Sequence, residues 1–181
     1  FRQAETTGFG GGTTIDAFAG VENVYNHGNQ PSLHIAWLFN YGGQPWRTQH
    51  WVRRICDVFY GTDPIHGYGY GQDEDQGQLG AWLVLAGLGL FDVQGGAGDL
   101  QTLQLAAPFF TKLRLELHPK YHSGGVWETR VHGDPSRDLY IQSAKLNNSP
   151  LERCWIPWET ITRGGSLDLT LGDQPKESWG R

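Results

Sequence analysis

The spacing of the hydrophobic residues changes after about residue 94, and this change limits the folds that the chain can adopt. Before it, apolar residues recur at the three- and four-residue intervals of buried helices. After it, they alternate with polar residues, as in strands that bury one face. A chain of 181 residues, 38% of them hydrophobic, can form a core on both sides of the change. The pattern predicts an α+β fold, helical over residues 1–94 and antiparallel β over residues 95–181.

Three helices are expected in the first part. The first follows Pro31 and ends before Gly42, the second runs from Pro45 to about Tyr60, and the third runs from Gln76 to about Leu90. Proline is tolerated at helix starts and glycine favours helix ends. Residues 1–30 are expected to be largely loop. Because three helices are few for a closed helical domain, we expect this part to belong to a larger helical array.

Five segments of the second part alternate with period two and are separated by glycine, proline and asparagine turn signals. They cover residues 103–105, 113–117, 126–131, 139–144 and 167–171. Strands joined by such short turns are expected to pair antiparallel.

Composition excludes several classes of function. The formal net charge of -5 and the absence of a run of Lys or Arg argue against a nucleic-acid partner. The longest apolar run, residues 79–91, is broken by glycines and too short to span a membrane. Residues 1–4 lack the apolar core of a signal peptide. Since the chain contains no methionine, we expect it to be processed, cut or part of a larger protein. Cys56 and Cys154 are expected to be free buried thiols.

Three acids in a row, Asp73, Glu74 and Asp75, precede the third helix in a glycine-rich loop. They have two interpretations. Asp75 is a good N-cap and forms a capping-box pattern with Gln78, while the other two acids favour the positive end of the helix dipole. Alternatively, Asp73 and Asp75 lie two apart in an extended stretch, so their carboxylates point to one side and hold a water or a metal ion. Glycosidases need carboxylates that flank the scissile bond.

The polar stretch from residue 26 to residue 34 is a second candidate site. Its amide and backbone oxygens suit a hard cation such as calcium. The alternative is a polar helix entry capped by Asn29 or Ser32. His34 stands on a largely apolar helix, where a lone histidine is more often a satisfied core residue than a ligand. Four tryptophans, at 127, 155, 158 and 179, are candidates for a sugar platform or for the core.

Several motifs, in order along the chain, resemble a signature of the glycoside hydrolase family 92 exo-α-mannosidases. They are residues 28–35 with 38–46, residues 73–78 with Ala81-Trp82, residues 140–144 with Leu146-Asn147, residues 164–167, and Trp179-Gly180. The resemblance covers roughly residues 25–181. It is more specific than any single motif.

The resemblance implies a calcium-dependent, inverting hydrolase that removes terminal α-linked mannose from N-glycan or mannan-type substrates. The family fold joins a β-sandwich to an (α/α)6 barrel. The chain resembles the final part, that is, the last helices of the (α/α)6-barrel catalytic domain followed by an antiparallel β region. The expected partner is the remainder of the same polypeptide or a complementary chain, and the expected location is secreted or periplasmic, with no membrane contact.

By resemblance, Asp75 matches the general base and Asp73 the residue that helps to hold the water. Asn29 and Gln30 fall in the motif near the calcium and the mannose, and His34 is assigned to substrate binding with them. The family usually has glutamate at position 30, and an amide offers calcium an oxygen without a charge. The general acid has no match here, so we expect the isolated chain to be inactive. The alternatives are a non-catalytic carbohydrate-binding module and a purely structural one.

Overall fold

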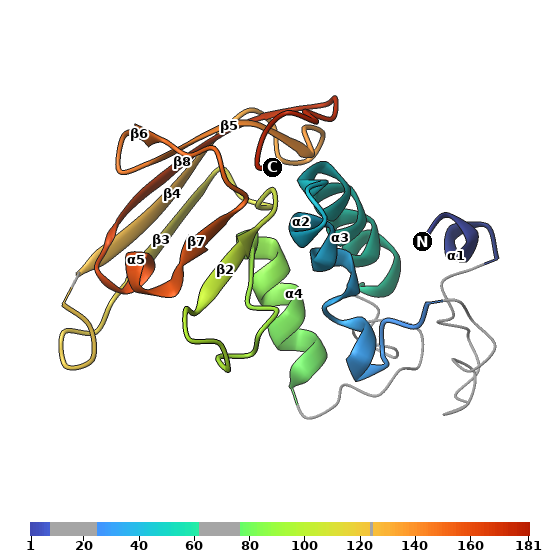
Figure 1. Cartoon of the computed structure of the whole chain (residues 1–181), viewed down its shortest axis with the longest axis horizontal. Coiled ribbons are helices and arrows are strands. Elements are labelled where there is room, and N and C mark those ends of the chain that lie inside the picture. Colours follow the sequence, from blue (N-terminus) through green and yellow to red (C-terminus); the bar gives the residue numbers. More distant parts are fainter. Residues whose placement is uncertain (8–24, 62–76, 124) are drawn as a thin grey trace.

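In the computed structural model, helices α1 (Arg2–Thr7), α2 (Leu38–Tyr41) and α3 (Pro45–Phe59) lie at one end of the molecule and the β-sheets at the other, with α4 (Gln78–Leu88) between them and the short helix α5 (Trp158–Thr162) among the strands (Figure 1). The structure describes residues 1–7, 25–61, 77–123 and 125–181. None of the helices in these residues is both long and apolar enough to cross a membrane. The α+β class predicted from the change of period is confirmed.

The helices follow the apolar periodicity, but the first predicted one is broken. The described elements are α1 (Arg2–Thr7), the 3-10 turns η1 (Gln30–Ser32) and η2 (Ile35–Trp37), α2 (Leu38–Tyr41), α3 (Pro45–Phe59), α4 (Gln78–Leu88) and α5 (Trp158–Thr162). The predicted helix after Pro31 is therefore two 3-10 turns and a single α-helical turn. A helix also occupies residues 2–7, where the sequence indicated loop. The second predicted helix is confirmed as α3, which Pro45 begins.

Helix α4 ends two residues before the predicted position, at Leu88 instead of about Leu90. Gly89 follows α4 with φ 71°, a left-handed conformation that ends a helix. Its carbonyl accepts a hydrogen bond from the Ala106 amide at 2.9 Å. A Cβ atom on residue 89 would lie 2.5 Å from the carbonyl oxygen of Ala106, so only glycine fits there. The chain therefore leaves the helix two residues earlier than predicted and continues as a strand.

The strands form two sheets. In the smaller sheet, β2 (Thr102–Leu105) lies between β1 (Leu90–Phe91) and β7 (Trp155–Pro157), and both pairs are antiparallel. The larger sheet has the order β3-β4-β8-β5-β6. Its strands are β3 (Lys112–Glu116), β4 (Val126–His132), β5 (Tyr140–Leu146), β6 (Ser149–Pro150) and β8 (Gly165–Gly172). All five predicted strands are present, and three short ones were not predicted.

One pair departs from the predicted antiparallel arrangement. Strands β4 and β8 are parallel, with Trp127 opposite Gly165 and His132 opposite Thr170. A parallel pair needs a long crossover. The 32 residues from 133 to 164 provide it, because they contain β5, β6, β7 and α5. The chain then returns between β4 and β5, where β8 pairs antiparallel with β5.

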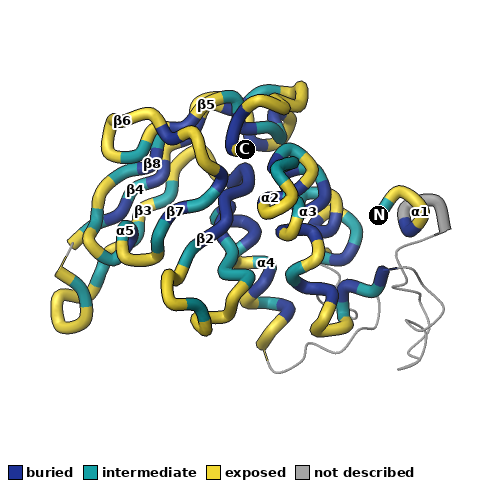
Figure 2. The backbone as a smooth tube through the Cα atoms, in the orientation of Figure 1, coloured by how far each residue is buried: buried dark blue, intermediate teal, exposed yellow. Residues whose placement is uncertain are grey.

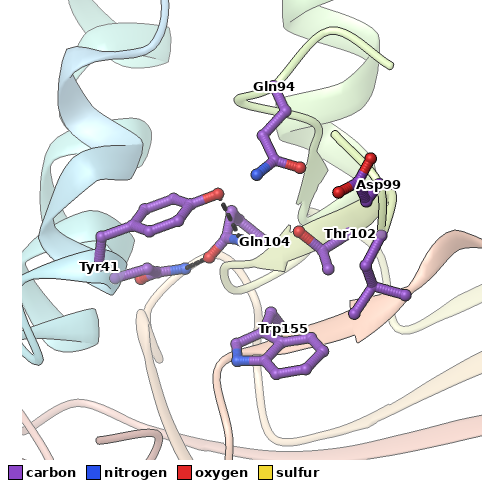
Figure 3. Close-up of a pocket in the computed structure, with 8 residues that line it drawn as sticks. Tyr41, Gln94, Asp99, Thr102, Gln104 and Trp155 are labelled. Atoms are coloured by element: carbon purple, nitrogen blue, oxygen red, sulfur yellow. Dashed lines mark hydrogen bonds between the residues drawn. The ribbon is translucent and has the colours of Figure 1, made fainter. Parts of the chain in front are cut away.

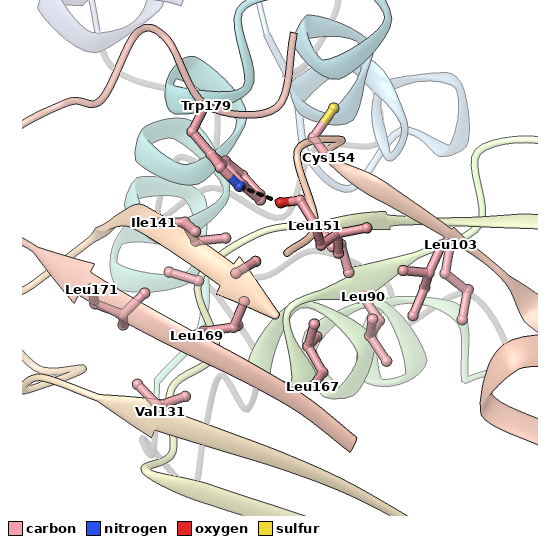
Figure 4. Packing of buried hydrophobic residues seen from close by; sticks show 14 of the residues in the cluster. Leu90, Leu103, Val131, Ile141, Leu151, Cys154, Leu167, Leu169, Leu171 and Trp179 are labelled. Carbon is pink, nitrogen blue, oxygen red and sulfur yellow. Dashed lines mark hydrogen bonds between the residues drawn. The ribbon is translucent and has the colours of Figure 1, made fainter. Parts of the chain in front are cut away.

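Buried residues form one cluster between the sheets and another among the helices (Figure 2). The sheet cluster includes Leu167 and Leu169 of β8 and Trp179 (Figure 4). Trp127 of β4 belongs to the same cluster. Trp127 and Trp179 are 0% and 3% exposed, so they do not take part in a sugar platform.

Buried amides join the helices to the sheets. The Asn40 side-chain nitrogen donates to the carbonyls of Leu105 and Cys154, each at 3.2 Å. The Gln49 side-chain oxygen accepts from the Ile141 amide at 2.9 Å. Each of these side chains gives a buried backbone group of the sheets a hydrogen-bond partner that it would otherwise lack.

Both cysteines are free and buried, as predicted. Burial raises the pKa of Cys56 to about 12 and that of Cys154 to about 11. Their thiols therefore stay protonated near neutral pH and behave as core residues.

Candidate functional site

The segment that carries Asn29 and Gln30 is a tight polar turn on the surface. Asn29 precedes η1 in an extended conformation, with φ -86° and ψ 119°, and its side chain makes no capping hydrogen bond. Asn29 and Gln30 are both exposed. The alternative in which Asn29 caps the helix entry is therefore wrong, and its amide oxygen is not used by η1.

His34 lies at the start of η2, where its carbonyl accepts a hydrogen bond from the Trp37 amide at 2.9 Å. Its ring is half-buried rather than enclosed in the core. Together with Gln30 it lines a cavity of about 320 Å³. The apolar part of its lining includes Trp82 and Phe91, and Gln78 at the start of α4 also lines it. Asn29 does not line it.

The start of α4 differs from the capping-box prediction. The helix begins at Gln78, and its N-cap is Gly77 with φ 94°. This left-handed conformation is one that L-residues rarely adopt, and it separates α4 from the residues before it. Asp75 is therefore not the N-cap, since it stands two residues ahead of that position. Asp73 and Asp75 themselves lie outside the described residues.

A buried chain of hydrogen bonds fixes the two edges of this cavity relative to each other. The Tyr25 hydroxyl lies 2.9 Å from His27 Nδ1, and His27 Nε2 lies 2.8 Å from the Tyr60 hydroxyl. The Tyr60 hydroxyl donates to the Leu79 carbonyl at 3.0 Å. Because Tyr60 uses its proton there, His27 Nε2 donates to it and Nδ1 accepts from Tyr25. The chain thus connects the Asn29 turn, the end of α3 and the start of α4.

Burial keeps this histidine neutral. His27 is 1% exposed, and desolvation lowers its pKa to about 3. Desolvation also raises the pKa of Tyr25. The Trp82 ring packs edge-on against the imidazole, with centroids 4.3 Å apart, and its indole nitrogen donates to the Leu33 carbonyl at 2.8 Å. The sequence did not identify His27, although it stands beside the Asn29 turn. Its partners Tyr25 and Tyr60 are brought to it by folding, and no local sequence pattern indicates this.

The described residues offer oxygen atoms rather than a complete metal site. Within residues 1–7, 25–61, 77–123 and 125–181, no group of three or more His, Cys, Asp or Glu side chains is placed to hold a metal ion. Asp92 also lines the cavity, but its carboxylate accepts from the backbone amides of Gln94 and Gly96 at 2.9 and 2.8 Å and is used to close its own turn. The exposed amides of Asn29 and Gln30 fit the oxygen preference of calcium but supply no charge.

Comparison with known proteins decides the family. The model of the glycosyl hydrolase family 92 catalytic domain matches residues 3–173. The chain belongs to glycosyl hydrolase family 92. Among curated proteins, this family 92 chain is 28% identical over 158 residues to an uncharacterized secreted glycosidase of Arthroderma benhamiae, a match that covers 87% of the chain and 19% of the relative.

Two solved structures from Bacteroides thetaiotaomicron resemble the family 92 chain. A family GH92 α-mannosidase matches with 25% identity and a TM-score of 0.74, over 87% of this chain and 20% of that one. A family GH92 inverting mannosidase matches with 31% identity and a TM-score of 0.73, over 86% of this chain and 20% of that one. The chain therefore spans about one fifth of the length of the relatives that it matches.

Proposed function

We propose that this chain forms part of an inverting exo-α-mannosidase that removes terminal α-linked mannose from N-glycan or mannan-type substrates. The observation that carries the proposal is the family match over residues 3–173, supported by the likeness to two mannosidase structures. One of these relatives is described as inverting. In this proposal the helices are the last ones of an (α/α)6 barrel, and the remainder of the barrel comes from the rest of the polypeptide.

In the proposed reaction, Asp75 is the general base and Asp73 helps to hold the attacking water. The base takes a proton from the water as it attacks the anomeric carbon on the face opposite the leaving oxygen, which inverts the configuration. A general acid from another part of the polypeptide protonates that oxygen. Two features favour this role: the N-cap of α4 is Gly77 rather than Asp75, and Gln78, three positions further along the sequence than Asp75, lines the cavity.

Calcium is the proposed cofactor, with side-chain oxygens of Asn29 and Gln30 among its ligands. Bound there, calcium would act as a Lewis acid on mannose hydroxyls. The support is the donor chemistry of two exposed amides, one of which is not used as a helix cap. The carboxylates that a calcium site needs would come from residues beyond this pair. Substrate contacts are assigned to the same two amides and to His34, which lines the cavity.

A secreted or periplasmic location is part of the proposal. Its support is that the curated relative from Arthroderma benhamiae is described as secreted.

Turnover of an aryl α-mannoside by the complete natural polypeptide tests the proposal. Asp75→Asn is expected to lower kcat at least about a hundredfold, since it removes the base, while Asp173→Asn, an exposed acid in a C-terminal loop, should leave kcat unchanged. A calcium chelator should abolish turnover, and added calcium should restore it. Proton NMR should detect β-mannose as the first product. Near-normal turnover by Asp75→Asn would exclude this base, and first-formed α-mannose would exclude inversion.

The 181-residue chain alone is expected to release no mannose, because no residue of it matches the general acid. Measurable release by the chain alone would show that it contains an acid of its own.

A further inference from the structure

A second cavity is lined in part by Gln94, Asp99 and Leu100, which follow Val93 of the candidate active-site cavity along the chain. It has a volume of about 560 Å³ and opens between α2, β2 and β7 (Figure 3). The two cavities share no lining residue. Tyr41 and Trp155 approach the second cavity from different sides, and Gln94, Asp99 and Gln104 also face it.

We propose that this cavity binds a neutral pyranose saccharide, separately from the site of hydrolysis. The aromatic side chains supply the first requirement, since flat rings pack against the C–H face of a pyranose. Tyr41 is 54% exposed, and Trp155 is half-buried at the edge of its sheet. The Arg153 guanidinium lies 4.2 Å from the Trp155 ring centroid, and its Nε donates to the Trp155 carbonyl at 3.2 Å. These contacts hold the indole in place, although Arg153 does not line the cavity.

Buried amides orient the polar part of the lining. Gln104 is only 3% exposed, and its amide nitrogen donates to the Tyr41 hydroxyl at 3.3 Å. Its oxygen accepts from the Asn40 amide nitrogen at 3.3 Å. The Tyr41 hydroxyl oxygen accepts the hydrogen bond from Gln104, so the hydroxyl proton is available to donate to a ligand.

Asn40 supplies a third amide of the lining, and its orientation is fixed by buried partners. Asn40 lines the cavity and is 6% exposed. Its side-chain nitrogen faces three acceptors, which sets the orientation of the amide. Its side-chain oxygen is buried and has no hydrogen-bond partner within the described part of the chain. This oxygen is enclosed by the protein, so Asn40 contributes to the wall of the cavity through its fixed amide and the fixed position of Gln104.

The charge of the lining favours a neutral ligand. Among the residues that the structure describes, Asp99 is the one acidic residue of the lining, which contains no Lys, Arg or His. A single carboxylate disfavours an anion, and the rings and amides around it do not form a multidentate cation site. A carboxylate and three amides beside two aromatic rings instead match the alternating hydroxyl and C–H surfaces of a sugar.

The complete natural polypeptide, labelled with 5-fluorotryptophan, allows a direct test by 19F NMR. The Trp155 resonance is assigned by its loss in Trp155→Phe. Methyl 1-thio-α-mannoside and methyl 1-thio-β-glucoside, which resist hydrolysis, serve as probes. The mannoside is chosen because of the proposed function. The choice of the glucoside does not depend on that proposal. A saturable shift of the Trp155 resonance with either sugar is the expected result.

Tyr41→Ala should weaken this binding about tenfold by removing one ring. Its matched control is Tyr121→Ala, because Tyr121 is 70% exposed and does not line the cavity. Asp99→Asn should also weaken binding. The site is overturned if neither sugar moves the Trp155 resonance, or if Tyr41→Ala binds as tightly as the Tyr121 control.

Hydrolysis is measured separately on the same proteins, so that the two proposals fail independently. Tyr41→Ala should keep its rate on an aryl α-mannoside. A protein that hydrolyses mannoside without any Trp155 response contradicts the second site alone. A protein that shows the Trp155 response without hydrolysis supports the second site and contradicts the proposed enzyme.

Discussion

His27 connects the turn that carries Asn29 and Gln30 to the start of α4. Three hydrogen bonds of 2.8–3.0 Å run from Tyr25 through His27 and Tyr60 to the Leu79 carbonyl. Each participant is buried or half-buried, so water does not compete strongly for these bonds. We therefore expect His27 to act as a positioning residue that stabilises the edges of the candidate active-site cavity.

His27→Ala should lower the free energy of unfolding by about 3 kcal/mol, because it leaves a cavity and takes one hydrogen-bond partner from each of the Tyr25 and Tyr60 hydroxyls. Urea unfolding followed by tryptophan fluorescence measures the change. His118→Ala is the control, since His118 is exposed, and its expected effect is below about 0.5 kcal/mol. Equal effects of the two substitutions would contradict the role given to the buried chain.

The stability contributed by neutral His27 should be lost in acid. Its folded pKa of about 3 lies below the ordinary value of 6.5. Between these values the unfolded chain binds a proton that the folded chain excludes. The contribution is therefore complete above pH 6.5 and falls as the pH drops towards 3, by about 1.4 kcal/mol per pH unit.

Urea unfolding at pH 7, 6 and 5 checks this expectation by comparing the protein with His27→Gln, which cannot titrate. The stability difference between the two should narrow as the pH falls. Parallel pH profiles would mean that His27 titrates alike in the folded and unfolded states.

At the scale of elements, α4 has two roles. Its residues line the candidate active-site cavity, and they also pack in the core of the helical part. Gly77 sets where it begins and Gly89 sets where it ends, both in left-handed conformations. Between them, Trp82 is 2% exposed, and its ring stacks on Tyr60 with centroids 5.9 Å apart. The same side chain reaches η1 through the Leu33 carbonyl. The position of α4 therefore depends on this tryptophan.

Trp82→Phe should cost about 2 kcal/mol of stability, because it keeps an aromatic ring but leaves the buried Leu33 carbonyl without its donor. Thermal unfolding measures the shift. Trp158→Phe provides the comparison, since Trp158 is 44% exposed on α5 and should change the midpoint little. If Trp82→Phe proved as stable as Trp158→Phe, the hydrogen bond to Leu33 would not be what holds α4 in place.

At the scale of the whole molecule, the C-terminal segment closes the junction of helices and sheets. Trp179 is 3% exposed, and its indole nitrogen donates to the Leu151 carbonyl at 2.9 Å (Figure 4). Gly180 pairs with Arg153 and approaches Pro45, since a Cβ atom there would lie 3.1 Å from Pro45 Cγ. The Trp179-Gly180 motif, which belongs to the family resemblance, therefore has a structural explanation.

Trp179→Ala should destabilise the protein by about 4 kcal/mol, the cost of emptying a buried tryptophan site. Differential scanning calorimetry should show the loss. Arg181→Ala is the control for a nearby surface residue. It tests whether the loss of stability in Trp179→Ala comes from emptying a buried site. Its guanidinium makes a surface ion pair with Glu177 at 3.8 Å, so its removal should change little. A comparable loss in both variants would contradict the explanation by burial of Trp179.

The sequence by itself determined the α+β class, helix α3, the five main strands and the family. These features depend on residues close together in the chain, because the period of the apolar side chains and the order of the motifs are local properties. The sequence also identified the Asn29 turn and the Asp73–Asp75 loop as candidate sites. Their chemical roles remain predictions.

Only the tertiary structure decided the remaining features. The parallel pairing of β4 with β8 depends on a crossover of 32 residues, and β1 and β7 are too short to show a period. The His27 chain and the Tyr41–Trp155 cavity each join side chains that lie far apart in sequence. The structure also separated the tryptophans that the sequence had left as candidates for a sugar platform or for the core. Trp127 and Trp179 lie in the core, whereas Trp155 lines a cavity. Partners, pKa values and cavities arise from packing between distant segments, which local periodicity does not encode.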